Sequence, residues 1–209
     1  PTVYGHDAIR VERPAAARLG AYTRERDPGE GAGVSLESIL RDELPPLEDL
    51  IVGGHPGPAG TSSQVAVIVG GLLLMWRGLI DWRIPLVGTL AMGAGLLTLP
   101  VPVTITEAGA QWHSLILPSA RADWPTTFTF MNYQLMAGPM LFVCFFVATW
   151  PQVRPANARA RTAFAAVLGV ASAAAQLYVS VAWGAYLALL LVSPLAAGLD
   201  RRMRARTLV

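Results

Sequence analysis

The stretch AFAAVLGVASAAAQLYVSVAWGAYLALLLVSPLAAGL, residues 163–199, contains no charged side chain. A helix that crosses the hydrocarbon core of a bilayer needs about 20 mainly apolar residues, so this stretch is long enough for two crossings. The pattern predicts one membrane-spanning helix over residues 163–181 and another over residues 183–199. Residues 165–175 are rich in Ala, Gly and Ser, and we expect this part of the first helix to face another helix.

Three further apolar runs upstream predict membrane spans near residues 65–80, 84–103 and 133–150. Between the last two, residues 105–131 form a polar and aromatic connection, which we expect at the membrane interface because Trp prefers the headgroup level. The expected fold is therefore all-α and embedded in the membrane, with about five transmembrane helices in residues 64–199.

The composition agrees with a membrane protein. Hydrophobic residues make up 53% of the chain, charged residues make up only 14%, and the mean hydropathy is +0.45. Soluble domains carry about 25% charged residues, so this chain has too few charges for a surface bathed in water. An intrinsically disordered chain and a nucleic-acid-binding domain are both excluded.

Arginine placement predicts the orientation of the helices. Arginines gather after the first predicted span, after the third, and in the tail: Arg77, Arg83, Arg154, Arg159, Arg161 and residues 200–209. In a five-span bundle these segments share one side, and positively charged loops usually stay in the cytoplasm. We therefore expect a bacterial inner-membrane protein with a basic cytoplasmic tail and a polar periplasmic segment over residues 1–63.

The N-terminal segment raises a question about the natural chain. A segment of this length would have to cross the membrane, yet no signal peptide is visible. Two interpretations stay open: Pro1 follows a removed initiator Met, or upstream membrane helices precede it. Within the segment, Ser35 is predicted to cap a short helix, with Ser38 at the capping-box position and Pro45 and Pro46 at its end.

Small residues within the predicted spans indicate close helix packing. The predicted packing or partner-facing positions are Gly70, Gly71, Gly138, Gly169 and Ala173. Glycines of this kind could instead let a flavin or quinone approach the backbone, but small residues are the ordinary means by which membrane helices pack, and we favour packing.

Amide side chains in the predicted spans have two interpretations. Asn132 with Gln134 and Gln176 with Tyr178 could bind a quinone headgroup, but we favour bonds to each other or to a neighbouring helix. Arg77 and Asp81, four residues apart, are predicted to pair on one helical face at the membrane boundary.

Metal and thiol chemistry have little support in the sequence. The three histidines lie far apart, so no metal site is predicted, and His55 and His113 are expected to be silent. Cys144 has apolar neighbours and is expected to be an inert, buried thiol.

Several motifs occur in one collinear series. GGHPGPAGTSS starts at Gly53, DWRIPL spans residues 81–86, LMAGPMLFVCFFVATWP spans residues 135–151, and an arginine-rich C-terminus follows. In this order they resemble the C-terminal half of the RnfD/NqrB family, the membrane flavoprotein subunits of the Rnf complex and of the sodium-pumping NADH:quinone oxidoreductase. The resemblance covers roughly residue 27 to the C-terminus, and it implies an RnfD/NqrB-like half.

The resemblance also shows where this chain departs from the family. Family members carry FMN as a phosphoester on a threonine in an S/T-G-A-T-P-L motif, and the corresponding stretch here, residues 30–36, reads EGAGVSL. Gly33 takes the acceptor position and has no hydroxyl, so covalent FMN is disfavoured. Ser35, two residues on, would be a substitute acceptor only if the alignment were shifted.

Two further departures concern polar positions. Thr61 stands where the family has an acidic residue, and Trp150 stands where it has Asp. Because polar groups at membrane depth usually mark function, these losses indicate a retained fold without its chemistry.

The sequence therefore predicts a non-catalytic accessory or scaffold subunit of a larger bacterial redox or photosynthetic electron-transport complex. No cofactor and no catalytic residue are predicted, and a quinone or lipid contact stays open. The expected partners are other integral membrane subunits and the lipid bilayer, without nucleic acid. The alternative is an active electron-transfer or ion-translocating subunit that binds flavin non-covalently or binds a quinone.

Overall fold

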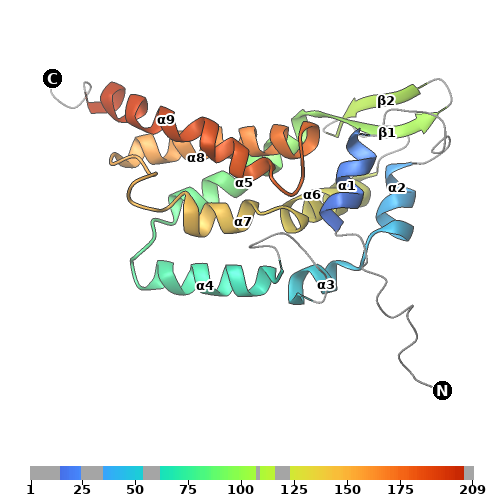
Figure 1. Ribbon diagram of the computed structural model, residues 1–209, viewed down its shortest axis with the longest axis horizontal. Helices are drawn as coiled ribbons and strands as arrows, with labels where there is room; N and C mark the ends of the chain where they lie inside the picture. The colour runs from blue at the N-terminus through green and yellow to red at the C-terminus, as the bar shows by residue number, and fades with distance from the viewer. Residues whose placement is uncertain (1–14, 25–34, 54–61, 107–108, 116–122, 205–209) are drawn as a thin grey trace, which may run out of the picture.

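The computed structural model describes residues 15–24, 35–53, 62–106, 109–115 and 123–204, and it is mostly helical (Figure 1). The elements in chain order are α1 (Ala15–Arg24), α2 (Leu36–Ser38) with a π-helical turn (Ile39–Glu43), α3 (Leu47–Val52), α4 (Gln64–Trp76), α5 (Arg83–Thr98), β1 (Pro100–Thr106), β2 (Gly109–Ser114), α6 (Trp124–Ala137), α7 (Met140–Phe142) with a π-helical turn (Val143–Val147), α8 (Ala158–Tyr178) and α9 (Gly184–Arg204).

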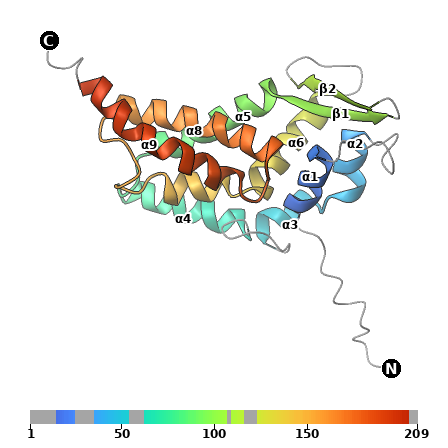
Figure 2. The same cartoon turned by 45° about the horizontal axis from the view of Figure 1, so that its top comes forward.

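The long helices lie side by side along the longest axis of the molecule, with α8 packed against both α5 and α9 (Figures 1 and 2). Among the described residues, α8 and residues 184–202 of α9 are each long and apolar enough to cross a membrane. Helix α6 passes the same test only together with Met140–Val147, and α4 and α5 are shorter apolar helices. The described helices thus supply two or three candidate spans, and the predicted count of five is not confirmed.

Helices α5 and α8 approach each other through residues with little or no side chain. A Cβ atom at Gly169 would collide with the carbonyl oxygen of Gly88, and one at Gly95 would lie 2.9 Å from the Cβ of Ala173. Close approach of two backbones in this way is how membrane helices gain packing energy where lipid offers no hydrophobic driving force.

The N-terminal residues fold onto one end of the helices. This N-terminal cap consists of α1, α2 with its π-helical turn, α3 and the hairpin β1–β2 (Figures 1 and 2). Leu19 and Leu36 are fully buried in the same core as the long helices. The Tyr22 hydroxyl donates a hydrogen bond to the Pro102 carbonyl at 2.8 Å, which joins α1 to β1.

The hairpin is absent from the all-α prediction. The predicted span over residues 84–103 ends early, because α5 stops at Thr98 and prolines at 100 and 102 cannot donate the hydrogen bonds of a continuing helix. An antiparallel ladder follows instead, from the pair Pro100–Ser114 to the pair Thr106–Gly109. It occupies part of the connection predicted for the membrane interface.

The predicted span over residues 133–150 also differs. Helix α6 starts at Trp124 and ends at Ala137, after which Gly138 is extended, with φ −93° and ψ 161°. Proline disfavours helical geometry in the residue before it, and this accounts for the break at Gly138–Pro139. The predicted capping box is confirmed, since the Ser35 side chain accepts from the Ser38 backbone N–H.

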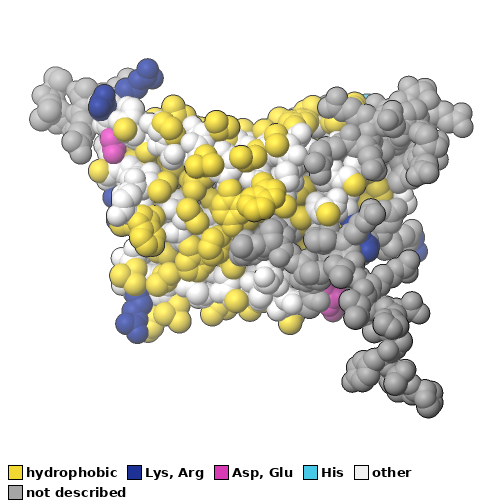
Figure 3. All heavy atoms as spheres, viewed as in Figure 1, with side chains coloured by type: hydrophobic (Ala, Val, Ile, Leu, Met, Phe, Trp, Pro, Cys, Tyr) yellow, Lys and Arg dark blue, Asp and Glu magenta, His cyan; other side chains and the backbone are white. Residues whose placement is uncertain are grey.

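The surface over the long helices is apolar. Figure 3 shows hydrophobic side chains across the middle of the helical region, and arginine side chains at corners of the end that carries the C-terminus. Trp76 is 85% exposed, and Leu190 and Leu191 of α9 are largely exposed as well. A surface of this kind is typical of contact with lipid or with other membrane helices.

Candidate functional site

The first candidate site lies at the break between α6 and α7. The axes of Trp124–Ala137 and Met140–Val147 are bent by 62° at this point. A broken helix exposes backbone carbonyl and N–H groups, which membrane proteins tolerate only where protein or water satisfies them.

Gln176 of α8 lies directly against the break. A Cβ atom at Gly138 would lie 2.5 Å from Nε2 and 2.8 Å from Cδ of Gln176, and one at Gly184 would lie 2.8 Å from its Cγ. The Gln176 side chain therefore lies against two glycines, one at the break and one at the start of α9. A side chain at either position would displace it.

Gln64 approaches the same break from α4. It is the first residue of that helix, it is fully buried, and its Nε2 donates to the Met136 carbonyl at 2.6 Å. This carbonyl belongs to the last turn of α6, where helix carbonyls have no partner within their own helix. The side chain thus satisfies one group that the break leaves open.

Four buried polar side chains in these helices are grouped here by chemistry under the name amide cluster: Gln64, Gln134, Ser172 and Gln176. Each is at most 1% exposed. Six of their side-chain atoms have no hydrogen-bond partner within the described chain: both amide atoms of Gln134, both of Gln176, Oε1 of Gln64 and Oγ of Ser172. Burying a polar group without a partner costs about 1–3 kcal/mol, so these side chains are costly to keep in the interior.

The favoured interpretation of the amide side chains is wrong for two of them. Gln134 and Gln176 do not bond each other or another described residue. Of the other two candidates, Tyr178 donates from its hydroxyl to the Pro100 carbonyl at 3.1 Å, and Asn132 is exposed. Gln64 and Ser172 are the cluster members that the sequence analysis missed. For Gln64, a polar residue that opens an apolar run is a usable signal.

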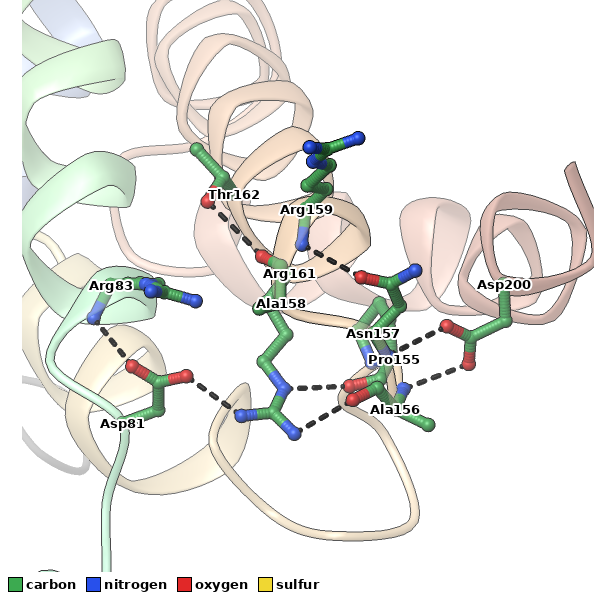
Figure 4. Close-up of polar contacts among 10 residues, drawn as sticks. All are labelled: Asp81, Arg83, Pro155, Ala156, Asn157, Ala158, Arg159, Arg161, Thr162 and Asp200. Atoms are coloured by element: carbon green, nitrogen blue, oxygen red, sulfur yellow. Dashed lines mark hydrogen bonds and ion pairs between the residues drawn. The ribbon is translucent and has the colours of Figure 1, made fainter. Parts of the chain in front are cut away.

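A second polar site, the helix clamp, lies where α5 and α8 begin (Figure 4). The Asp81 carboxylate accepts from Arg161 Nη1 at 2.7 Å and from the Arg83 backbone N–H at 3.1 Å. Arg161 also donates to the carbonyls of Pro155 and Ala156, at 2.9 and 2.8 Å. One guanidinium therefore joins the loop before α5 to the loop before α8.

Asp200 of α9 completes the helix clamp. Its carboxylate accepts from the backbone N–H groups of Ala156 and Asn157, at 2.8 and 3.1 Å (Figure 4). Burial by itself would raise the pKa of Asp81, but the hydrogen bond from Arg161, the Arg83 backbone bond and the two positive charges outweigh it and lower that pKa. Asp81 and Arg161 therefore form a structural ion pair within the helix clamp.

The predicted pairing of Arg77 with Asp81 is wrong. Helix α4 ends at Trp76 and Gly78 turns the chain with φ of 72°, so the two residues never share a helical face. Asp81 pairs with Arg161 across 80 residues of sequence, and no local pattern indicates such a contact.

The predicted packing residues lie between helices of this chain. A Cβ at Gly71 would collide with the Phe145 ring, and one at Gly70 would lie 3.5 Å from Phe146 Cζ, which brings α4 against the π-helical turn. Gly138 lies against Gln176, while Gly169 and Ala173 lie in the α5–α8 contact. Their role toward partner subunits stays a prediction.

The remaining predicted positions add less information about a functional site. Gly33, His55 and Thr61 lie outside the described residues, and Trp150 is exposed. The Ser35 hydroxyl is part of its helix cap. Cys144 is a buried free thiol, and no group of three or more His, Cys, Asp or Glu among the described residues could hold a metal ion.

The sequence profile of the family described as NQR2, RnfD, RnfE matches residues 7–208. The chain belongs to this family. The match runs through both the amide cluster and the helix clamp, and with the apolar helices it assigns the chain to a membrane.

Individual relatives agree with the family assignment. In Pseudomonas aeruginosa, a protein named as a subunit of the ion-translocating oxidoreductase complex is 28% identical over 183 residues, covering 83% of this chain and 46% of the relative. Proteins of the same name in Halorhodospira halophila and Yersinia pestis are 31% identical over 134 residues and 30% identical over 137 residues, covering 64% and 65% of this chain and 31% and 32% of the relatives. The chain spans less than half the length of these family members.

Proposed function

We propose that this chain is an accessory membrane subunit of an ion-translocating oxidoreductase complex. Its membership of the NQR2, RnfD, RnfE family and the names of its relatives support the type of complex. The exposed apolar side chains of α4 and α9 offer the surface that contacts with other membrane subunits and lipid require.

One observation carries the accessory role: the stretch that resembles the flavin motif offers no free hydroxyl. Gly33 has none, and the hydroxyl of Ser35 accepts from the Ser38 backbone N–H at 3.2 Å in a capping box. We propose that the chain carries no covalent FMN.

The proposal includes an arrangement in the bacterial inner membrane. The helix clamp and the arginine-rich tail lie at the cytoplasmic side, and the N-terminal cap lies at the periplasmic side. Helices α4 and α5, extended by their flanking residues, and the bent pair α6–α7 then act as three spans beside α8 and α9. Single-cysteine labelling in a Cys144→Ala background tests this orientation at Trp76 and Trp183.

The decisive experiment isolates the native complex through a tag on this chain and measures the intact mass and the in-gel flavin fluorescence of each subunit. We expect this chain in stoichiometric amount with the other membrane subunits and without flavin. Ser35→Ala should leave its mass unchanged apart from the substitution, as should the matched variant Ser38→Ala. A mass excess of one FMN that Ser35→Ala alone removes would overturn the accessory role.

The amide cluster favours a second candidate, an ion-translocating subunit. Polar side chains at a broken membrane helix are a common setting for ion movement. The complex carrying Gln176→Met, reconstituted in proteoliposomes, separates the two functions. Unchanged rates of electron transfer and ion uptake support the accessory role, and loss of ion uptake from an intact complex supports translocation.

A further inference from the structure

One end of the long helices carries more positive charge than its carboxylates neutralise. The helix clamp brings together there the α4–α5 connection, the loop before α8 and the end of α9 (Figure 4). Asp81 and Asp200 are the acidic residues of these described segments, and both already accept hydrogen bonds within the helix clamp. Six arginines with described side chains, besides Arg161, belong to the same segments and form what we call the arginine end: Arg77, Arg83, Arg154, Arg159, Arg201 and Arg202.

The guanidinium groups of the arginine end are not engaged by carboxylates. None of the six makes an ion pair with a residue of the described chain. The Arg83 guanidinium lies over the Trp82 ring, 5.9 Å from its centroid, and the Arg159 side chain points away from the helix clamp (Figure 4). Each guanidinium carries five N–H donors and a permanent positive charge, so the arginine end is suited to an anionic partner outside this chain.

Helix α4 shows at what depth these charges lie in the membrane. Along its last turn the exposed side chains change from Leu72 and Leu73 to Trp76, which is followed at once by Arg77. A phospholipid has the same order, with acyl chains below, an interfacial region where Trp is enriched, and a phosphate above. The order apolar, aromatic, cationic therefore favours a lipid over an acidic protein surface.

The opposite end of the helices differs in charge and not in aromatic content. Trp124 and Trp183 are exposed there, as Trp82 and Trp150 are at the arginine end. The described charged side chains of the N-terminal cap and the start of α6 have a small acidic excess: Arg18 and Arg41 against Glu37, Glu48, Asp49 and Asp123. Tryptophans thus mark both membrane surfaces, and only the arginine end selects for negative charge.

We infer that the arginine end binds the headgroups of anionic phospholipids, with Trp76, Trp82 and Trp150 at headgroup depth. Guanidinium groups bind phosphate oxygens through paired, charge-assisted hydrogen bonds. Clusters of four to eight basic residues beside a membrane helix are a known means of binding anionic lipid. The inference requires the membrane location of the chain and is independent of the accessory or translocating role.

Native mass spectrometry of the full chain tests the inference, with micelles that contain equal amounts of phosphatidylglycerol and phosphatidylethanolamine. The two lipids are given the same acyl chains, so they differ only in the headgroup and its charge. We expect at least a tenfold preference for phosphatidylglycerol, since each arginine near a headgroup contributes about fivefold. This preference should fall as the ammonium acetate concentration rises. Equal retention of the two lipids would overturn the inference.

Arg77→Gln separates lipid binding from folding, because the Arg77 side chain has no partner within the described residues. It should melt like the wild type while its preference for phosphatidylglycerol falls about two- to fivefold, and Arg77→Lys should retain most of the preference. Arg41→Gln, on an exposed arginine of the opposite end, is the matched control and should change nothing. An equal fall in both Gln variants contradicts the inference. So does release of another subunit from the native complex by Arg77→Gln with the lipid preference unchanged, which would identify an acidic protein partner.

Discussion

Asp81→Asn tests the helix clamp, which holds three helix ends together through two carboxylates. Asparagine keeps an oxygen for the Arg83 backbone N–H but turns its NH2 toward Arg161, so the substitution removes both the charge and the hydrogen bond of the contact with Arg161. The two side chains are only 15% and 22% exposed, so water screens this pair less than a surface pair.

The expected cost follows from the geometry. A hydrogen bond to a charged group contributes about 1.5–3 kcal/mol, and Arg161 retains its bonds to two backbone carbonyls in the variant. We therefore expect Asp81→Asn to lower the free energy of unfolding by about 1–2 kcal/mol. For a chain of this size that is a fall of roughly 2–8 °C in melting temperature.

The assay is thermal unfolding in detergent micelles, followed by tryptophan fluorescence, as a double-mutant cycle with Arg161→Met. Arg161→Met should cost more than Asp81→Asn, because it also frees the carbonyls of Pro155 and Ala156. Arg159→Met, on an exposed side chain of the same helix turn, is the control and should cost little. If the changes in the free energy of unfolding caused by the two substitutions are additive to within about 0.3 kcal/mol, the ion pair contributes nothing and the reasoning fails.

Three other measurements test the same structure. The pKa of Asp81 is lower in the folded than in the unfolded chain, so its ion pair adds stability at pH values above the unfolded-state pKa of about 4. This stability is lost as the pH falls through the folded-state pKa, and the melting curves of the wild type and Asp81→Asn should converge there. Gly169→Leu should lower the free energy of unfolding by about 3 kcal/mol or more, because the new side chain separates α5 from α8. Gly198→Leu is the control: position 198 faces open space, and this variant should melt like the wild type. Equal melting temperatures for the two variants would disprove the close contact. Ser35→Ala should lower the free energy of unfolding by about 1 kcal/mol through loss of the helix cap, measured by chemical denaturation, and no change would show that the cap does not contribute.

Local signals in the sequence predicted local structure well. The capping box at Ser35 and Ser38 formed as expected, because its partners lie within one turn. The break at Gly138–Pro139 had an equally local signal in the X-Pro pair, but the long apolar run around it favoured one continuous span. The hairpin was missed for a similar reason, since Val101 and Val103 extended the apolar run past the prolines that end α5.

The candidate sites depended on contacts that no local pattern encodes. Gln134 and Gln176 were recognised as polar residues in apolar helices, but only the folded structure shows that their amide atoms are buried without a partner. The same holds for Asp81, whose nearest basic residue in sequence is Arg83 but whose charged partner is Arg161.

By itself, the sequence determined that this chain is a mostly helical member of a membrane-protein family, because apolar run length, arginine placement and motif order are properties of the linear chain. The tertiary structure decided which polar groups pair, which stay open at the broken helix, and how the N-terminal cap closes one end of the bundle. The physical reason is that hydrogen bonds and ion pairs act over a few ångströms, and only packing brings residues 80 positions apart within that range.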